Sequence, residues 1–174
     1  NFPIEDMIVA NVWEKTINCN WKSFWENFNE CLHCPNIHPE LTELVPMFTR
    51  RIINPQDLSG WVPKTRESDP KFSGGLKKGA QTWSEDGLAQ GCQIDSLSEN
   101  DLLKGHVYAS SWPSMFIGGY SDHVRIVRVT PTESEKVTIT SEWLFEVETL
   151  KNENYNKENV ISFACRVMEQ DAKA

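Results

Sequence analysis

The chain has 174 residues, with 25 acidic and 17 basic side chains and a net charge of −8. A chain of this length can bury a core without disulfides, so we predict a single domain over residues 1–174. The acids are scattered and the longest basic run is Arg50 and Arg51, which argues against a nucleic-acid partner. No apolar run is long enough for a membrane span or signal peptide, so we expect no membrane partner and a cytoplasmic location.

The first predicted element is a helix over residues 20–34, "NWKSFWENFNECLHC". Asn20 is the expected N-cap, because its side chain can accept a hydrogen bond from a free backbone N–H of the first turn. Pro35 is expected to stop this helix, and Pro39 to begin a short one with His38 at its cap. The apolar residues that carry the helical spacing are Trp21, Phe24, Trp25, Phe28 and Leu32.

Residues 54–81 are rich in Pro, Gly, Ser and charge and predict a long loop, which is functional or disordered. The segments that follow favour an antiparallel sheet with one face covered. Residues 157–171 return to helical spacing, so two long helices flank the sheet and the fold class is α+β. The predicted strands are residues 102–111, 114–120, 123–131 and 136–147, with a turn at 132–135.

The stretch "NECLHCPNIHPE", residues 29–40, contains two of the four histidines of the chain. One interpretation is a structural zinc site formed by Cys31, His33, Cys34 and His38. Its geometry argues against it, because His33 would lie about a hundred degrees around the helix from Cys34. No second Cys/His pair follows at the usual distance, and cysteines beside apolar residues are more often small core residues.

The alternative is an iron site, which needs two imidazoles and a carboxylate on one face of the metal. His33 and His38 would supply the imidazoles. Asp171 is the candidate third ligand, because it falls within the apolar stripe of the last helix, eleven positions after Val160. A carboxylate that faces a core must be paired, protonated or bound to a metal. The competing interpretation is that the helix frays and Asp171 points to water.

Other side chains have two interpretations each. Glu30 precedes His33 by three residues and could hydrogen-bond its second ring nitrogen, or be a solvated helix acid. His106 and His123 fall in predicted strands and are interpreted as satisfied sheet histidines or pocket-wall residues rather than ligands. No nucleophile elbow, phosphate loop or dinucleotide fingerprint is present, which removes the main support for hydrolase and nucleotide-binding functions. The tryptophan candidates for pocket walls are Trp13, Trp61, Trp83 and Trp112.

The segment "NWKSFWENFNECLHCPNIHPEL" resembles the signature of the catalytic domain of Rieske-type non-haem iron oxygenases, the ring-hydroxylating α subunits. Residues 112–145 resemble the central strands of that family. "VMEQDAKA", residues 167–174, resembles the helix that brings the third metal ligand, which places that ligand at Asp171. The family's motif maps onto Asn20, Trp21, Lys22, Glu26, Asn27, Phe28, Glu30, His33 and His38.

The resemblance implies a helix-grip, START-like fold, in which a curved antiparallel sheet and long helices enclose a pocket. It implies a mono- or dioxygenase that hydroxylates a small organic substrate with O₂ at mononuclear Fe(II). His33, His38 and Asp171 would be the iron ligands, and Asn27 and Glu30 catalytic residues. In the family, the acid at the position of Glu30 connects a metal histidine with the Rieske histidine of a neighbouring subunit.

The resemblance also implies partners outside this chain. Electrons would come from a Rieske 2Fe–2S cluster on an N-terminal domain, fed by a ferredoxin or reductase, in a homotrimer. The two Cys/His pairs that hold such a cluster are not found here, and the sequence starts at Asn1 without an initiator methionine. We therefore expect a domain that is truncated at both ends and inactive alone.

The substrate class stays open. Aromatic-ring dioxygenases of the family usually have Asp at the position of Glu30, whereas this sequence resembles relatives that oxidise quaternary ammonium compounds. The competing functional class is a metal-free helix-grip domain that binds a hydrophobic small molecule. The presence of both histidines together with Asp171 argues against that alternative.

Overall fold

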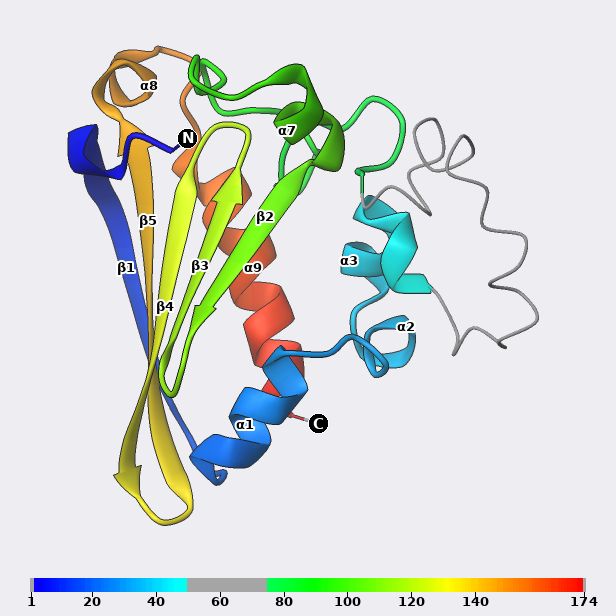
Figure 1. Ribbon diagram of the computed structural model, residues 1–174, viewed down its shortest axis with the longest axis vertical. Coiled ribbons are helices and arrows are strands. Elements are labelled where there is room, and N and C mark those ends of the chain that lie inside the picture. The colour runs from blue at the N-terminus through cyan, green and yellow to red at the C-terminus, as the bar shows by residue number, and fades with distance from the viewer. Residues whose placement is uncertain (1, 50–74, 174) are drawn as a thin grey trace.

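The computed structural model describes residues 2–49 and 75–173. Its centre is one antiparallel sheet with the strand order β1-β5-β4-β3-β2 (Figure 1). Four of the strands confirm predicted β segments, although residues 102–104 of the first predicted segment are helical, and the first strand was not predicted. The strands are β1 Met7–Ile17, β2 His106–Ser111, β3 Met115–Tyr120, β4 Val124–Glu133 and β5 Lys136–Glu146.

The two central strands show why one face of the sheet is the core. In β5, buried and half-buried residues alternate from Lys136 to Trp143, because successive side chains of a strand point to opposite faces. The same alternation in β4 buries Arg125, Val127 and Val129. An arginine therefore occupies a position on the core face of a central strand.

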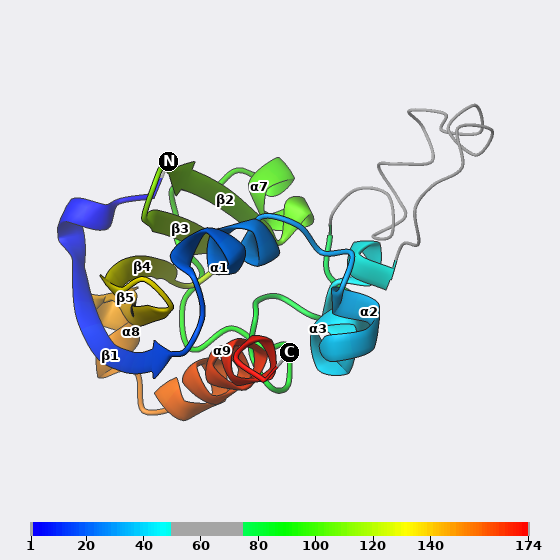
Figure 2. The same cartoon turned by 90° about the horizontal axis from the view of Figure 1, so that it is seen from below.

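Two helices cover this face. Helix α1, Trp21–Phe28, and helix α9, Lys157–Asp171, lie inside the curve of the sheet, as Figure 2 shows from below. Phe24 and Trp25 of α1 share one buried cluster with side chains of α9 and of strands β3, β4 and β5. The shorter helices are η1 Ile4–Asp6, α2 Cys34–Ile37, α3 Pro39–Leu44, η2 Pro46–Thr49, α7 Glu99–Lys104 and α8 Val147–Lys151.

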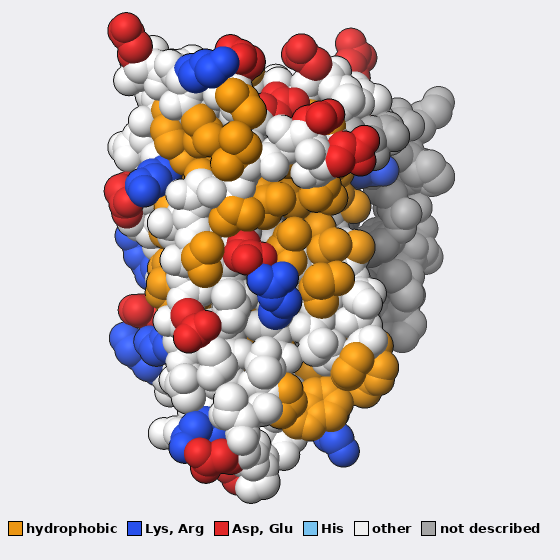
Figure 3. Space-filling view, turned by 90° about the vertical axis from the view of Figure 1, so that its left-hand side faces the viewer, with side chains coloured by type: hydrophobic (Ala, Val, Ile, Leu, Met, Phe, Trp, Pro, Cys, Tyr) orange, Lys and Arg blue, Asp and Glu red, His pale blue; other side chains and the backbone are white. Residues whose placement is uncertain are grey.

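The side of the molecule that carries β1 exposes apolar side chains among charged ones (Figure 3). Strand β1 contributes Ile8, Val9 and Val12, each about half exposed. These residues lie at an edge of the sheet, where only one neighbouring strand, β5, is paired with β1. The described residues thus form an open antiparallel sheet combined with helices, which confirms the α+β class.

The first helix is shorter than predicted. It begins after the expected cap, since the Asn20 side chain accepts a hydrogen bond from the backbone N–H of Lys22 at 3.0 Å. It ends at Phe28 because the side chain of Asn29 donates to the carbonyl of Trp25 at 2.8 Å and competes with a further helical turn. Pro35 therefore does not stop this helix but lies in the first turn of α2.

Two further helix predictions are confirmed. The last helix has its predicted bounds, and α3 begins at Pro39 with His38 at its N-cap. The predicted loop of residues 54–81 lies outside the described residues up to position 74, and residues 75–81 form neither helix nor strand. Within the described ranges, no helix is long and apolar enough to cross a membrane.

Candidate metal centre

Three predicted ligands come together from two distant parts of the chain. His33 ends the bend that follows α1, His38 lies between α2 and α3, and Asp171 is the last residue of α9. Nε2 of His38 lies 2.8 Å from Oδ1 of Asp171, and Nε2 of His33 lies 3.3 Å from the same oxygen. Two imidazole nitrogens and one carboxylate oxygen therefore converge on one point.

The second nitrogen of each imidazole, Nδ1, forms a hydrogen bond with a side chain that lies outside the three converging donors. Nδ1 of His33 donates to Oε1 of Glu30 at 2.7 Å, and Nδ1 of His38 donates to Oε1 of Gln170 at 2.8 Å. Such partners fix the ring orientation and the tautomer of metal-binding histidines, because they keep the proton on Nδ1 and leave Nε2 for the metal. The predicted contact of Glu30 with His33 is present, although both residues lie in a bend rather than on a helix.

The charges around the site favour a cation between His38 and Asp171. Burial of His38 disfavours its charged form, but the hydrogen bonds to Asp171 and Gln170 outweigh burial and raise its pKa. Burial likewise opposes ionisation of Glu30, and hydrogen bonds from His33 and the N–H of Leu32 outweigh it and lower the pKa of Glu30. A proton shared at this point is replaced when a metal binds there, since metal ligands must be deprotonated.

Asp171 does not point to water. Its side chain is only 9% exposed, so the fraying interpretation is wrong. Nδ2 of Asn27, on the last turn of α1, donates to Oδ1 of Asp171 at 3.1 Å. Asn27 and both histidines thus contact the same carboxylate oxygen, and α1 and the end of α9 are connected through it.

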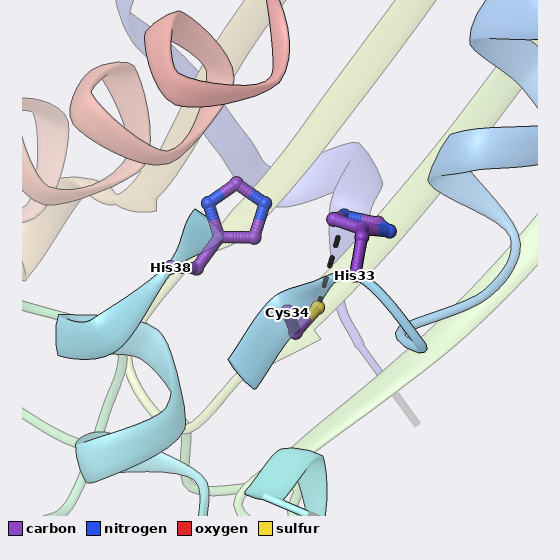
Figure 4. Close-up of side chains that lie close together, drawn as sticks. All are labelled: His33, Cys34 and His38. Carbon is purple, nitrogen blue, oxygen red and sulfur yellow. Dashed lines mark hydrogen bonds between the residues drawn. The ribbon is translucent and has the colours of Figure 1, made fainter. Parts of the chain in front are cut away.

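Cysteine lies closer to the site than the sequence indicates. Donor atoms of His33, Cys34 and His38 lie within 4.8 Å of one another, and Figure 4 shows the contact of His33 with Cys34. The helical spacing used to argue against a cluster of these donors does not apply, because helix α1 ends at Phe28, before His33 and Cys34. Cys34 forms a disulfide with Cys31, which the sequence analysis missed, so neither sulfur offers the thiolate that a zinc site needs.

A cavity of about 430 Å³ opens beside the three converging side chains. Its volume is at the small end of the range for ligand sites, and most of its lining is apolar or aromatic. Of the predicted wall residues, Trp83 lines this cavity. Trp13 packs against the main core and Trp112 is 66% exposed, while Trp61 lies outside the described residues.

The other two histidines lie away from the converging donors. His123 is buried directly before β4, and its Nδ1 donates to the carboxylate of Asp122 at 2.7 Å, which satisfies that nitrogen. His106 packs against the rings of Trp83 and Tyr108, and its Nδ1 is buried without a hydrogen-bond partner. Of the two predicted alternatives, His123 is therefore the satisfied histidine and His106 a pocket-wall residue, since His106 lines a second cavity.

Two residues of this region were missed. Gln170 contacts His38, and its amide nitrogen also donates to Glu40 at 3.1 Å. Its only signal in the sequence is its position next to Asp171. Arg125 lines the cavity from β4, and its signal is the alternation with Val127 and Val129, which predicts a common face.

Two solved structures are similar to this chain in fold. A quaternary ammonium Rieske monooxygenase, with a structure described in terms of carnitine oxidation by gut microbiota and inter-subunit electron transfer, has 12% identity and a TM-score of 0.54. The match covers 97% of this chain and 39% of that one. Naphthalene 1,2-dioxygenase from Rhodococcus sp., bound to indole, has 14% identity and a TM-score of 0.52, with 96% and 42% covered. These likenesses show the fold.

This chain spans about two fifths of the length of those two solved chains. The family model described as "Ring hydroxylating alpha subunit (catalytic domain)" matches residues 4–174. Because this match covers nearly the whole sequence, the chain belongs to the family of ring-hydroxylating α-subunit catalytic domains.

Proposed function

We propose that this chain is the single catalytic domain of a Rieske-type non-haem iron oxygenase, and that His33, His38 and Asp171 hold its Fe(II). The observation that carries the proposal is the convergence of both histidine Nε2 atoms on Oδ1 of Asp171. Two imidazoles with one carboxylate are the donor set of mononuclear iron oxygenases, which leaves other metal positions open. A metal-free binding domain is not favoured, because it has no need of three converging donors.

The chain's own residues would orient the ligands. Glu30 and Gln170 fix the two imidazole rings, and Asn27 holds the carboxylate of Asp171. When bound, Fe(II) would activate O₂ for hydroxylation of a small organic substrate, with electrons from a Rieske 2Fe–2S cluster outside this chain. We further propose that Glu30 connects His33 with the Rieske histidine of a neighbouring subunit, as the family resemblance implies.

The wider assembly is part of the same proposal. A homotrimer and a ferredoxin or reductase donor follow from the family, and a matched monooxygenase structure is described in terms of inter-subunit electron transfer. The described residues do not contain the two Cys/His pairs that hold a Rieske cluster. Turnover is therefore expected only with a Rieske partner.

The cavity beside the converging donors is the proposed substrate pocket, and its lining includes residues of α9 and of strands β2, β3 and β4, as a helix-grip fold would require. Its aromatic lining suits an aromatic ring, through ring–ring contacts, and also a quaternary ammonium group, through cation–π contacts. Both substrate classes occur among the matched structures, as a naphthalene dioxygenase and a quaternary ammonium monooxygenase.

The test is anaerobic Fe(II) titration of the wild-type chain and of Asp171→Ala. The wild type is expected to bind one Fe(II). Asp171→Ala is expected to bind Fe(II) more weakly by a larger factor than the roughly 10- to 100-fold that loss of an outer partner costs. Glu169→Ala is the matched control, because Glu169 lies on the same helix turn but pairs with Lys15 at the surface. Equal Fe(II) affinity in Asp171→Ala and wild type would remove Asp171 from the site.

A further inference from the structure

Arg125 is a charged side chain in a core position. The alternation of β4 places it on the same face as Val127 and Val129, and it is only 6% exposed. In the sheet it lies directly opposite Trp143 of β5, a fully buried residue. A guanidinium stays protonated in proteins, so this position holds a permanent positive charge.

The partners of this guanidinium are all neutral. Nε donates to Oγ of Ser141 at 2.9 Å, and Nη2 donates to the sulfur of Met168 at 2.7 Å, a weak acceptor. Cζ lies 5.4 Å from the centroid of the Trp143 ring, and the guanidinium also contacts the hydroxyl of Tyr120. Across residues 2–49 and 75–173, Arg125 forms no ion pair.

The other arginines of the described ranges behave differently. Arg128 pairs with Glu142 and Arg166 pairs with Glu85, and both side chains are more than 40% exposed. A buried charge is normally paired, because burial without a counter-charge is costly. The most buried arginine is therefore the one that lacks a carboxylate.

Arg125 lines the cavity of the candidate metal centre. It contacts Met168, which lies about one helical turn before Asp171 on α9, and all three residues line the same cavity. The lining also contains the aromatic rings of Phe28, Phe48, Trp83 and Phe116, and the carboxylates of Glu30 and Asp171 lie on the side of the candidate metal centre. The cavity thus combines one buried cation with room for an apolar body.

We propose that the substrate of this site is a small carboxylic acid, whose carboxylate pairs with Arg125 and whose aromatic or alkyl body fills the cavity. This inference rests on the proposed function and names the charge of its substrate. A guanidinium matches a carboxylate with two parallel hydrogen bonds, a strong and directional pair in a buried site.

The test is calorimetric titration of the metal-free chain with two probes of nearly the same shape, benzoate and neutral benzamide. Benzoate is expected to bind the wild type at least about tenfold more tightly than neutral benzamide. Arg125→Met should abolish this preference and still fold, because an apolar side chain in place of a buried charge is often tolerated. Arg128→Met is the matched control on the same strand and should keep the preference.

A carboxylate can also bind at His33 and His38. The Arg125→Met variant therefore decides whether the benzoate preference comes from Arg125. Retention of the benzoate preference in Arg125→Met, equal binding of benzoate and benzamide, or no saturable benzoate binding would each overturn the inference. If Arg125→Met does not fold, Arg125→Lys replaces it and should keep a weaker benzoate preference, whereas an unchanged one overturns the inference. Fe(II) titration of the same samples separates the two proposals, since loss of the iron site leaves the Arg125 result intact.

Discussion

His106 offers a sharp test of how burial controls ionisation in this fold. It is the first residue of β2, and its ring centroid lies 5.1 Å from that of Trp83 and 5.3 Å from that of Tyr108. Its Nδ1 is buried without a partner. Burial lowers the pKa of His106 from 6.5 to about 4. The neutral imidazole is therefore the folded form at neutral pH.

The sign of the pH effect follows from that pKa. Below pH 6.5 the unfolded chain gains a proton at His106, while the folded chain resists protonation until the pH approaches 4. His106 therefore does not change the free energy of unfolding at pH 8, and it lowers that free energy as the pH falls from 6.5 toward 4. The pKa difference corresponds to a loss of about 2 kcal/mol in the free energy of unfolding between pH 8 and pH 5.

The perturbation is His106→Phe, which keeps a ring among the aromatic neighbours and removes the titrating group. Urea unfolding followed by tryptophan fluorescence at pH 8 and pH 5 gives the free energy of unfolding of each variant. Between these pH values the wild type should lose about 2 kcal/mol more than His106→Phe. Tyr108→Phe is the control, because it perturbs the same ring cluster without removing an imidazole. Equal losses in His106→Phe and wild type would refute the reasoning.

Two further predictions concern the partners of the histidines. Gln170→Leu should weaken Fe(II) binding by roughly 10- to 100-fold, because Nδ1 of His38 loses its acceptor; unchanged affinity in an anaerobic titration would contradict this. Glu30→Gln, tested in the complete oxygenase, should retain Fe(II) but slow product formation, since the proposed link to the Rieske histidine loses its carboxylate. Turnover at the wild-type rate would reduce Glu30 to an acid that only orients His33.

Local patterns predicted most of the fold. The helical spacing around Val160 and Phe163 predicted α9 with its correct bounds, and β-branched alternation predicted β4 and β5. Strand β1 was missed because it is an edge strand, where Ile8, Val9 and Val12 are exposed and no simple alternation results. The length of α1 was overestimated because the apolar spacing continues past Asn29, whose side chain ends the helix.

The three candidate ligands were predictable from local patterns in their own segments. The spacing of His33 and His38 and the core-facing position of Asp171 were visible in the sequence, and the structure brings all three together. The partners Gln170 and Arg125 were not found, because their contacts join α9 to a turn and to a strand far away in the sequence. Periodicity assigns a residue to a face, but only tertiary packing decides which side chain it meets there.

The position of Asp171 makes most sense if a cation shares its site. A carboxylate at the C-terminal end of a helix meets the negative end of the helix dipole, and the last turn of α9 contains no basic residue. Burial adds a second cost, since the side chain is only 9% exposed. Both costs are offset when protonated Nε2 of His38 donates a hydrogen bond to the carboxylate, or when a divalent metal binds between these two atoms. Fold stability alone gives no reason to place an acid here, whereas a metal-binding role does.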